Sequence, residues 1–277
     1  MRVHAISTGT VRVTTRQRRG SGPGPLRPLL TMLDREFTDP LPIWTWAIEH
    51  PEGVIVVDTG ETARTSEPGW FPRWHPYFHL AVRFDVSPEQ EIGPQLRALG
   101  IEPGDVRKVA VTHLHTDHAG GLGHFPDSEI LVSKAELDLA SGTMGKLRGF
   151  IPHRWPGWFE PTAFETRSEP FGPFEASLPL TEAGDVRIVP TPGHTHGHVS
   201  VVLDEGERVV FFAGDTTYDE ALLLDDAIDG VCPDPDAARA TMGRIRAQAV
   251  ERPTVYLPTH DPRAGERLEA REPLALA

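Results

Sequence analysis

The sequence predicts an α/β protein with sheets inside and helices outside, and two observations lead to this fold class. Short runs rich in β-branched residues recur along the chain, as expected of buried strands. Segments with helical spacing of apolar residues lie between several of these runs, some of them after capping residues. Strands and helices therefore alternate loosely, in two similar halves. We expect residues 1–277 to form a single domain, with a loop-rich insertion around 143–180.

The first half opens with a segment at 11–30 whose Arg, Gly and Pro content predicts a solvated loop. Residues 41–48 and 54–57 predict a hairpin, because the Pro-Glu-Gly sequence between them is typical of a turn. A helix is expected over 87–100, because its opening sequence Ser-Pro-Glu-Gln matches a capping box with proline at the first helical position.

The centre of the chain predicts a strand over 107–112, a helix that starts near Ala119, and a strand over 129–132. Ser133 and Glu136 predict a second capping box. The remaining elements are three strands, a helix capped by Asp, and a final strand, expected at 186–190, 199–203, 208–213, 235–250 and 254–257.

The charge balance excludes one class of partner. Asp and Glu number 40 against 27 Lys and Arg, so the net charge is -13. This argues against nucleic acid, whose binding depends on basic surface. No run approaches the ~20 apolar residues of a membrane span, and the first residues contain no stretch of signal-peptide length. We therefore expect a cytoplasmic protein that acts on a small molecule. Cys232 is the one cysteine; we interpret it as structural.

The strongest functional signal is the sequence Val-Thr-His-Leu-His-Thr-Asp-His, which directly follows the apolar run 109–111. It places four metal-competent side chains within six residues, at the end of a buried strand: His113, His115, Asp117 and His118. Such a cluster would be costly at the edge of a core unless a cation neutralised it.

Four other predicted strands also end in a potential ligand or orienting residue: Asp58, His194, Asp215 and His260. Because active sites in α/β proteins gather at strand ends, we expect all these side chains to converge.

The ligand count predicts two metal ions. His113, His115 and His194 would hold one ion. Asp117, His118 and His260 would hold the other, and the two carboxylate oxygens of Asp215 would bridge them. Each ion would then keep room for water, as catalytic sites do. Zinc is the expected metal, although Fe, Co or Mn would accept the same ligands.

Three residues near this set receive different roles. In Gly-His-Thr-His-Gly-His, His194 is the expected ligand because it lies nearest the strand end, and His196 and His198 are expected to be supporting or structural. Asp58 is expected to accept a hydrogen bond from a ligand histidine and so fix its tautomer.

The pattern His-x-His-x-Asp-His, followed by Pro-Gly-His194, Gly-Asp215 and His260, resembles the metallo-β-lactamase superfamily. The resemblance spans residues 54 to 260 and implies an αββα sandwich with a dinuclear site along one edge. Within the superfamily, Ala-Gly-Asp-Thr-Thr-Tyr218 is similar to the N-acyl-homoserine lactonases. In that family the matching tyrosine meets the substrate carbonyl, which implies this role for Tyr218.

The implied reaction is the opening of a lactone ring, with N-acyl-homoserine lactones as substrates (quorum quenching). A hydroxide shared by two cations would attack the carbonyl, since metal binding lowers the pKa of water to about 7. Tyr218 would donate a hydrogen bond to the oxyanion, and Asp117 would relay the proton to the leaving alkoxide.

Aromatic residues in two loop-like segments predict the substrate pocket. They are Trp70, Trp74, Phe150, Trp155 and Trp158. They would form an apolar wall for an acyl chain, or the two segments would pack on each other as a lid or a homodimer contact.

Other activities on this fold stay open. A thioesterase of the glyoxalase II type, or another ester or phosphoester hydrolase, would share the ligands without needing Tyr218. A persulfide dioxygenase would hold a single iron. A flavodiiron protein is disfavoured, because its motif has Glu where this chain has His115. A non-enzymatic binding module would be expected to lose ligands, and this chain keeps all seven.

Overall fold

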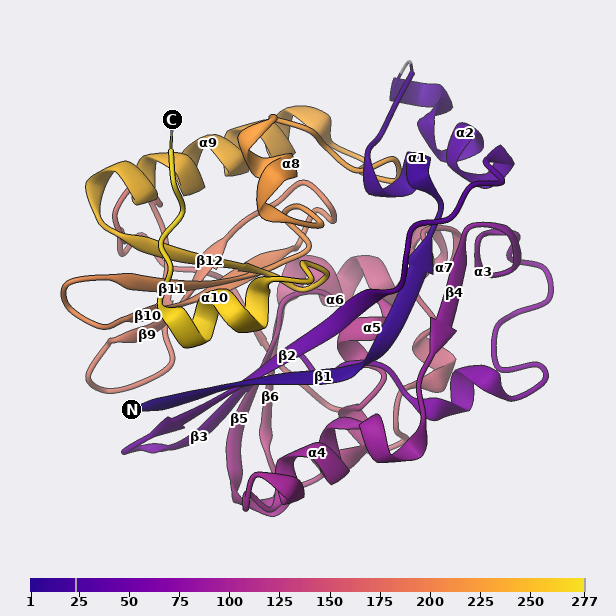
Figure 1. Cartoon of the computed structure of the whole chain (residues 1–277). Coiled ribbons are helices and arrows are strands. Elements are labelled where there is room, and N and C mark those ends of the chain that lie inside the picture. Colours follow the sequence, from indigo (N-terminus) through magenta and orange to yellow (C-terminus); the bar gives the residue numbers. More distant parts are fainter. Residues whose placement is uncertain (23, 277) are drawn as a thin grey trace.

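The computed structural model describes residues 1–22 and 24–276, and two sheets stack face to face in it with helices on their outer sides (Figure 1). The larger sheet has the order β4 (Val82–Asp85), β1 (Arg2–Val13), β2 (Leu41–His50), β3 (Gly53–Val57), β5 (Val106–Val111), β6 (Glu129–Ser133) and β7 (Thr162–Phe164). The smaller has the order β12 (Thr254–Pro258), β11 (Val209–Gly214), β10 (Val199–Asp204), β9 (Val186–Pro190) and β8 (Leu178–Pro179). The predicted α/β class and αββα sandwich are confirmed.

Ten α-helices lie in the described residues. They are α1 (Thr15–Arg18), α2 (Arg27–Leu33), α3 (Tyr77–Leu80), α4 (Ile92–Ala98), α5 (Thr116–Ala119), α6 (Lys134–Ser141), α7 (Thr143–Leu147), α8 (Glu220–Leu224), α9 (Pro235–Glu251) and α10 (Ala264–Ala270). Among these described helices, none has the length and apolar character that crossing a membrane requires.

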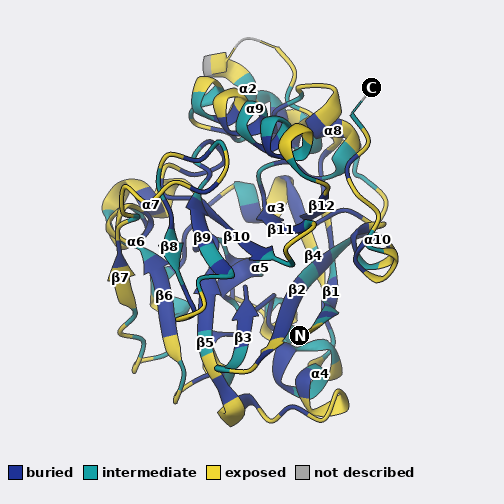
Figure 2. Cartoon of the chain, turned by 90° about the vertical axis from the view of Figure 1, so that its left-hand side faces the viewer, coloured by how far each residue is buried: buried dark blue, intermediate teal, exposed yellow. Residues whose placement is uncertain are grey.

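Strand alternation builds the apolar layers, because successive residues face opposite sides of a sheet. In β3, Ile55 and Val57 belong to the layer between the two sheets, whereas Val56 packs on the outer side with α4. In β11, Phe212 points into the same central layer and Phe211 packs on the outer side with α9. Figure 2 shows the result as buried strands enclosed by helices with exposed outer surfaces.

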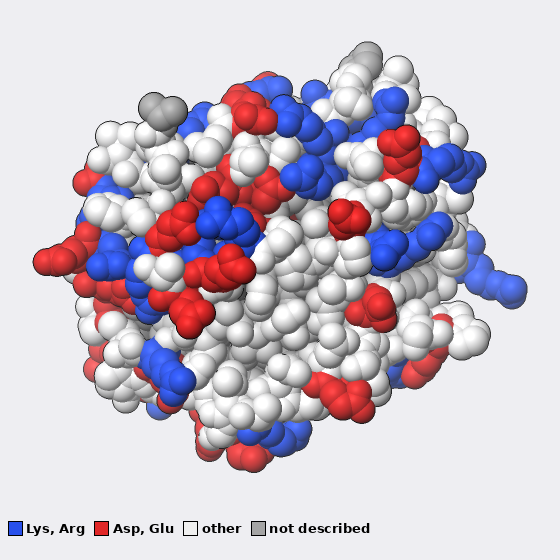
Figure 3. Space-filling model, in the orientation of Figure 1, with Lys and Arg blue, Asp and Glu red and all other residues white. Residues whose placement is uncertain are grey.

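The carboxyl ends of four strands, β3, β5, β11 and β12, lie at one edge of the sandwich. β3 pairs in parallel with β5, and β11 pairs in parallel with β12. The residues that follow these four strands therefore meet there. On the face seen in Figure 3, Lys and Arg side chains are interspersed with Asp and Glu rather than gathered into one basic surface.

The prediction of a solvated loop over 11–30 is wrong. β1 continues to Val13 and pairs with both β2 and β4, and α1 and α2 follow it. The Arg-rich composition hid the strand, in which Val11 and Val13 are buried while Arg12 between them is exposed. Position 23 of this segment lies outside the described residues.

The prediction of a helix that starts near Ala119 is also wrong, because α5 begins at Thr116 and Ala119 is its last residue. The helix is a single turn, closed by hydrogen bonds from the amides of His118 and Ala119 to the carbonyl of His115. Within 143–180, the longest helix or strand is the five-residue α7.

Of the two predicted capping boxes, only the first forms. Ser87 and Gln90 cap a 3-10 turn (Pro88–Gln90), and α4 begins after it at Ile92. Ser133 makes no side-chain cap bond, because Glu136 turns into the core, where its carboxylate accepts other hydrogen bonds.

Candidate metal centre

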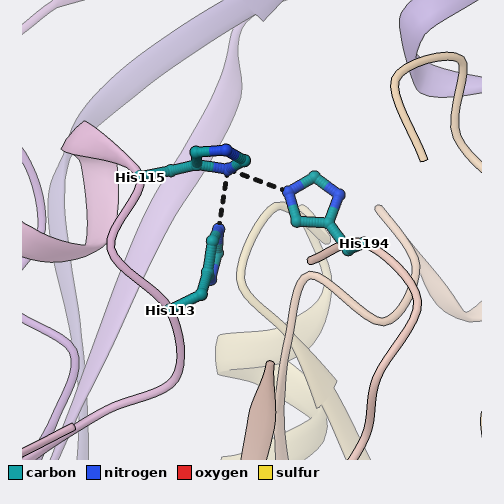
Figure 4. Close-up of side chains that lie close together, drawn as sticks. All are labelled: His113, His115 and His194. Carbon is teal, nitrogen blue, oxygen red and sulfur yellow. Dashed lines mark hydrogen bonds between the residues drawn. The ribbon is translucent and has the colours of Figure 1, made fainter. Parts of the chain in front are cut away.

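Three histidines converge at the carboxyl ends of the strands. His113 and His115 follow β5, and His194 lies in the loop after β9. Nδ1 of His115 lies 3.0 Å from Nε2 of His113 and 3.0 Å from Nε2 of His194 (Figure 4). In a tetrahedral zinc site with Zn–N bonds of 2.0–2.1 Å, two ligand nitrogens lie about 3.3 Å apart. The three rings are therefore arranged as ligands of one ion would be.

A second cluster lies beside the first. Nε2 of His260 is 3.4 Å from Oδ2 of Asp117, and Nε2 of His118 is 4.0 Å from Oδ1 of the same carboxylate. The ligand atoms of Asp117, His118 and His260 all lie within 4.8 Å of one another. The structure thus brings His113, His115 and His194 together in one group and Asp117, His118 and His260 in another.

Asp215 faces both clusters. Its Oδ1 lies 3.3 Å from Nε2 of His118 and 3.4 Å from Nε2 of His260, whereas its Oδ2 lies 3.5 Å from Nε2 of His194. It follows Gly214, which adopts a left-handed φ of 56°. A Cβ at Gly214 would also lie 2.6 Å from Nε2 of His198, so this tight turn requires glycine.

Two buried atoms of this site, Nε2 of His118 and Oδ1 of Asp215, lie 3.3 Å apart, but neither has hydrogen-bond geometry to the other or to any other described residue. Leaving such groups unsatisfied costs about 1–3 kcal/mol each. Burial alone would lower the pKa of His118, but the carboxylates of Asp215 and Asp58 outweigh burial and raise that pKa well above its usual value. The carboxylates of this site thus favour a positive charge next to the histidine rings. Imidazole and carboxylate groups are also ligands that divalent cations accept.

In His118, His194 and His260, the ring nitrogen Nδ1, which points away from the clusters, contacts a hydrogen-bond acceptor. Nδ1 of His118 lies 2.8 Å from Oδ2 of Asp58, and Nδ1 of His194 lies 2.9 Å from Oδ2 of Asp229. Nδ1 of His260 lies 2.9 Å from the carbonyl oxygen of Pro42. Carboxylates and carbonyls only accept, so each Nδ1 donates and each Nε2 is the nitrogen that faces the site, where a bound ion would take the place of a proton. Sequence reasoning missed Asp229, which lies in an irregular segment after α8 and carries no motif.

His198 is buried but uses both ring nitrogens within the protein. Its Nε2 accepts a hydrogen bond from the amide of Asp215 at 3.0 Å, and its Nδ1 lies 3.1 Å from the carbonyl of Thr191. Burial, together with the charge of His194, lowers the pKa of His198 to about 3. The ring is therefore neutral and braces the Asp215 backbone. His196 is exposed and belongs to neither cluster.

Glu136 ties two ligand loops together, and sequence reasoning assigned it elsewhere. Its carboxylate accepts a hydrogen bond from the amide of Leu114 at 3.1 Å and from the hydroxyl of Thr195 at 2.7 Å. Leu114 lies between His113 and His115, and Thr195 follows His194 in the chain. One buried side chain of α6 thus fixes the spacing of the three-histidine cluster.

A cavity of about 790 Å³ adjoins the cluster. Four candidate ligands line it: His115, Asp117, His194 and Asp215. Its apolar wall comes mainly from the N-terminal segment, α3 and the insertion, and it includes Val11, Met32, Trp74, Phe78, Leu147 and Phe150. Of the five aromatic residues assigned to a substrate pocket from the sequence, Trp74 and Phe150 line this cavity. The ring of Phe150 also stacks on His115, with centroids 4.8 Å apart.

Three of the predicted pocket residues do not line this cavity. Trp70 is buried between the guanidinium groups of Arg64 and Arg154, each 4.5 Å from its ring centroid. Trp155 packs edge-on against Phe159, and Trp158 is 40% exposed. Cation–π contacts therefore account for the position of Trp70, and packing against Phe159 accounts for that of Trp155, so neither requires a bound substrate.

Tyr218 lies beside the second cluster, with its ring stacked on His260 at a centroid distance of 5.2 Å. It lines the cavity. Cys232 lines the cavity too, but its thiol donates to the carbonyl of Gly193 at 3.2 Å. Burial, together with the charge of Asp229, raises the pKa of the thiol to about 12.

An αββα sandwich whose strand ends carry such a donor set defines the class of metal-dependent hydrolase domains. A family model for the Metallo-beta-lactamase superfamily matches residues 38–260. The chain belongs to this superfamily.

Individual proteins extend the comparison. The chain is similar to a probable metallo-hydrolase of Mycobacterium tuberculosis, with 32% identity over 64% of this chain and 57% of that protein. It therefore spans little more than half the length of this relative. It is also similar to an N-acyl homoserine lactonase of a Bacillus species, with 31% identity over 68% of each chain.

Among solved structures, an N-acyl homoserine lactone hydrolase superposes with a TM-score of 0.77 at 21% identity, covering 97% of this chain and 95% of that one. That structure contains the product N-hexanoyl-L-homoserine at its catalytic metal centre. At this identity the likeness supports the fold.

Proposed function

We propose that this chain holds two divalent metal ions and opens the lactone ring of N-acyl-homoserine lactones, and that it thereby quenches quorum-sensing signals. The observation that carries this proposal is the Asp215 carboxylate, which faces a three-histidine cluster with one oxygen and the Asp117, His118 and His260 cluster with the other. The Bacillus relative, named as a lactonase, supports the substrate class.

When bound, the ions supply a Lewis acid and lower the pKa of water to about 7. His113, His115 and His194 would hold one ion, Asp117, His118 and His260 the other, and Asp215 both. Zinc suits imidazole and carboxylate ligands, and Fe, Co and Mn accept the same set.

Tyr218 supplies a hydrogen bond at the carbonyl. Burial, together with the nearby Tyr77 and Asp215, raises the pKa of Tyr218 well above its usual value, so its hydroxyl stays protonated. A preorganised donor of this kind, directed at an oxygen that gains negative charge, contributes roughly 2.7–4 kcal/mol.

Asp117 carries the proton to the leaving alkoxide. Its side chain is 14% exposed, against 6% for Asp215, and it lines the cavity. It is therefore the more accessible of the two carboxylates. The apolar cavity wall then receives the acyl chain.

The test is pH-monitored hydrolysis of a small lactone and thioester panel by protein of measured metal content. We expect about two divalent ions per chain, and a Tyr218→Phe variant that loses lactone hydrolysis by about 10²–10³-fold in kcat. Faster thioester than lactone hydrolysis with no effect of Tyr218→Phe would favour a glyoxalase II-type enzyme instead. One iron per chain would favour a persulfide dioxygenase, and full activity without metal would refute the mechanism.

A further inference from the structure

A second tyrosine hydroxyl lies next to that of Tyr218, and one glutamine contacts both. Nε2 of Gln17 lies 2.7 Å from the hydroxyl oxygen of Tyr77 and 2.9 Å from that of Tyr218. The three residues come from α1, α3 and the segment after β11. All three line the cavity that also contains Asp117 and Asp215.

The glutamine amide determines how the two hydroxyls are used. An amide NH₂ group has two hydrogens and no acceptor, so both tyrosine oxygens accept from it. Each hydroxyl then keeps its own hydrogen for another group, and neither makes a further hydrogen bond within the described part of the chain. Two donors are thus left facing the cavity.

Among the described residues, the side chain of Gln17 makes hydrogen bonds only to these two hydroxyls. Gln17 is 2% exposed, and the oxygen of its side-chain amide, Oε1, is buried without a hydrogen-bond partner among the described residues. Buried amides in native proteins normally satisfy both ends. A residue that leaves one end unsatisfied while fixing two cavity hydroxyls fits a site built around those hydroxyls.

The separation of the two donors restricts what they can bind. Since both oxygens contact the same nitrogen, at 2.7 and 2.9 Å, the distance between them is at most 5.6 Å, the sum of the two. In an N-acyl-homoserine lactone, the ring carbonyl and the side-chain amide carbonyl are separated only by one carbon and the amide nitrogen. A pair of neighbouring donors is therefore complementary to this pair of neighbouring acceptors.

We propose that Tyr77 is a specificity-determining residue that donates a hydrogen bond to the side-chain amide carbonyl of the substrate, beside Tyr218 at the ring carbonyl, and that Gln17 positions both hydroxyls. This inference rests on the proposed lactonase function and narrows its substrate class to lactones with an acylamino group next to the ring carbonyl.

The experiment compares kcat and KM for an N-acyl-homoserine lactone and for an α-alkyl-γ-butyrolactone of equal chain length, which lacks the amide. We expect Tyr77→Phe to lower kcat/KM about tenfold for the acylamino lactone, mainly through KM, and to leave the alkyl lactone within twofold. Tyr218→Phe should lower kcat on both. Gln17→Met should reduce the preference for the acylamino lactone and also lower kcat on both, because both hydroxyls lose their anchor.

The matched control is Tyr256→Phe, which removes a buried hydroxyl that bonds Thr216 and Thr217 and does not line the cavity. It should leave the ratio of the two kcat/KM values unchanged. A Tyr77→Phe variant that affects both lactones equally, or neither, overturns this inference while lactone hydrolysis itself stands. Failure of the unmodified protein to open either lactone would instead remove the proposed function.

Discussion

The metal centre and the wall of the cavity beside it are built in different ways. In the metal centre, most of the close ligand-atom pairs lie 3.0–3.5 Å apart, and their residues follow the strands β5, β9, β11 and β12. The wall comes from short helices and the insertion, and some of its side chains are open to solvent, with Trp74 58% and Leu147 60% exposed. In the proposed function, the rigid sheet edge would fix the reacting groups, and the cavity wall would select the substrate.

The largest expected effect tests the metal centre. His118→Ala should remove the second ion and reduce kcat by 10²-fold or more (on the order expected when a metal ligand is lost), since no other described side chain replaces its Nε2. Metal content per chain and kcat are measured together. The matched control is His196→Ala, an exposed histidine of neither cluster, which should retain both ions. An unchanged rate in His118→Ala would remove this residue from the ligand set.

A smaller effect is expected one step away from the ligands. Asp229→Asn keeps the shape of the side chain but weakens the hold on Nδ1 of His194, so metal affinity should fall about 10–100-fold. Competition with a chelator measures this affinity. Asp225→Asn, an exposed residue at the end of α8, is the control and should not alter it. Equal affinities for the two variants would mean that Asp229 does not orient the ligand.

Changes in the cavity wall should alter kcat/KM less than changes at the metal ligands, and only through substrate binding. In the unmodified protein, kcat/KM should rise up to about fourfold for each methylene added to the acyl chain, until the chain fills the wall. Trp74→Ala should flatten this rise, whereas Trp158→Ala, outside the cavity, should leave it in place. A profile that is flat from the start would contradict the assignment of the wall to the acyl chain.

The smallest effect is expected at Cys232, which lines the cavity without a proposed role. With a pKa of about 12, its thiolate fraction at pH 8 is on the order of 10⁻⁴. Alkylation by iodoacetamide, followed by whole-protein mass, should therefore be slow and should accelerate about tenfold per pH unit. Rapid modification at pH 8 would show a thiol that is more exposed and more acidic than this site allows.

The sequence alone predicted the α/β class and the set of residues that meets at the sheet edge, and its resemblance to the metallo-β-lactamase superfamily implied the sandwich. The class and the residue set follow from local patterns: an apolar run typical of a strand, then a histidine or aspartate within two residues of its end, as at Val111 and His113 or Gly214 and Asp215. The composition of 11–30 misled in the same local way, because a strand with an exposed Arg12 resembles a loop.

Only the tertiary structure decided what surrounds those residues. Asp229 reaches His194 from 35 positions away, and Gln17 reaches Tyr218 from 201 positions away. Glu136 does not form the predicted capping box with Ser133. A buried carboxylate needs hydrogen-bond donors, and the folded loops that contain the ligands supply them through Leu114 and Thr195. A strand or a cap depends on neighbours in the chain, but a hydrogen bond between distant side chains exists only after the whole chain has folded.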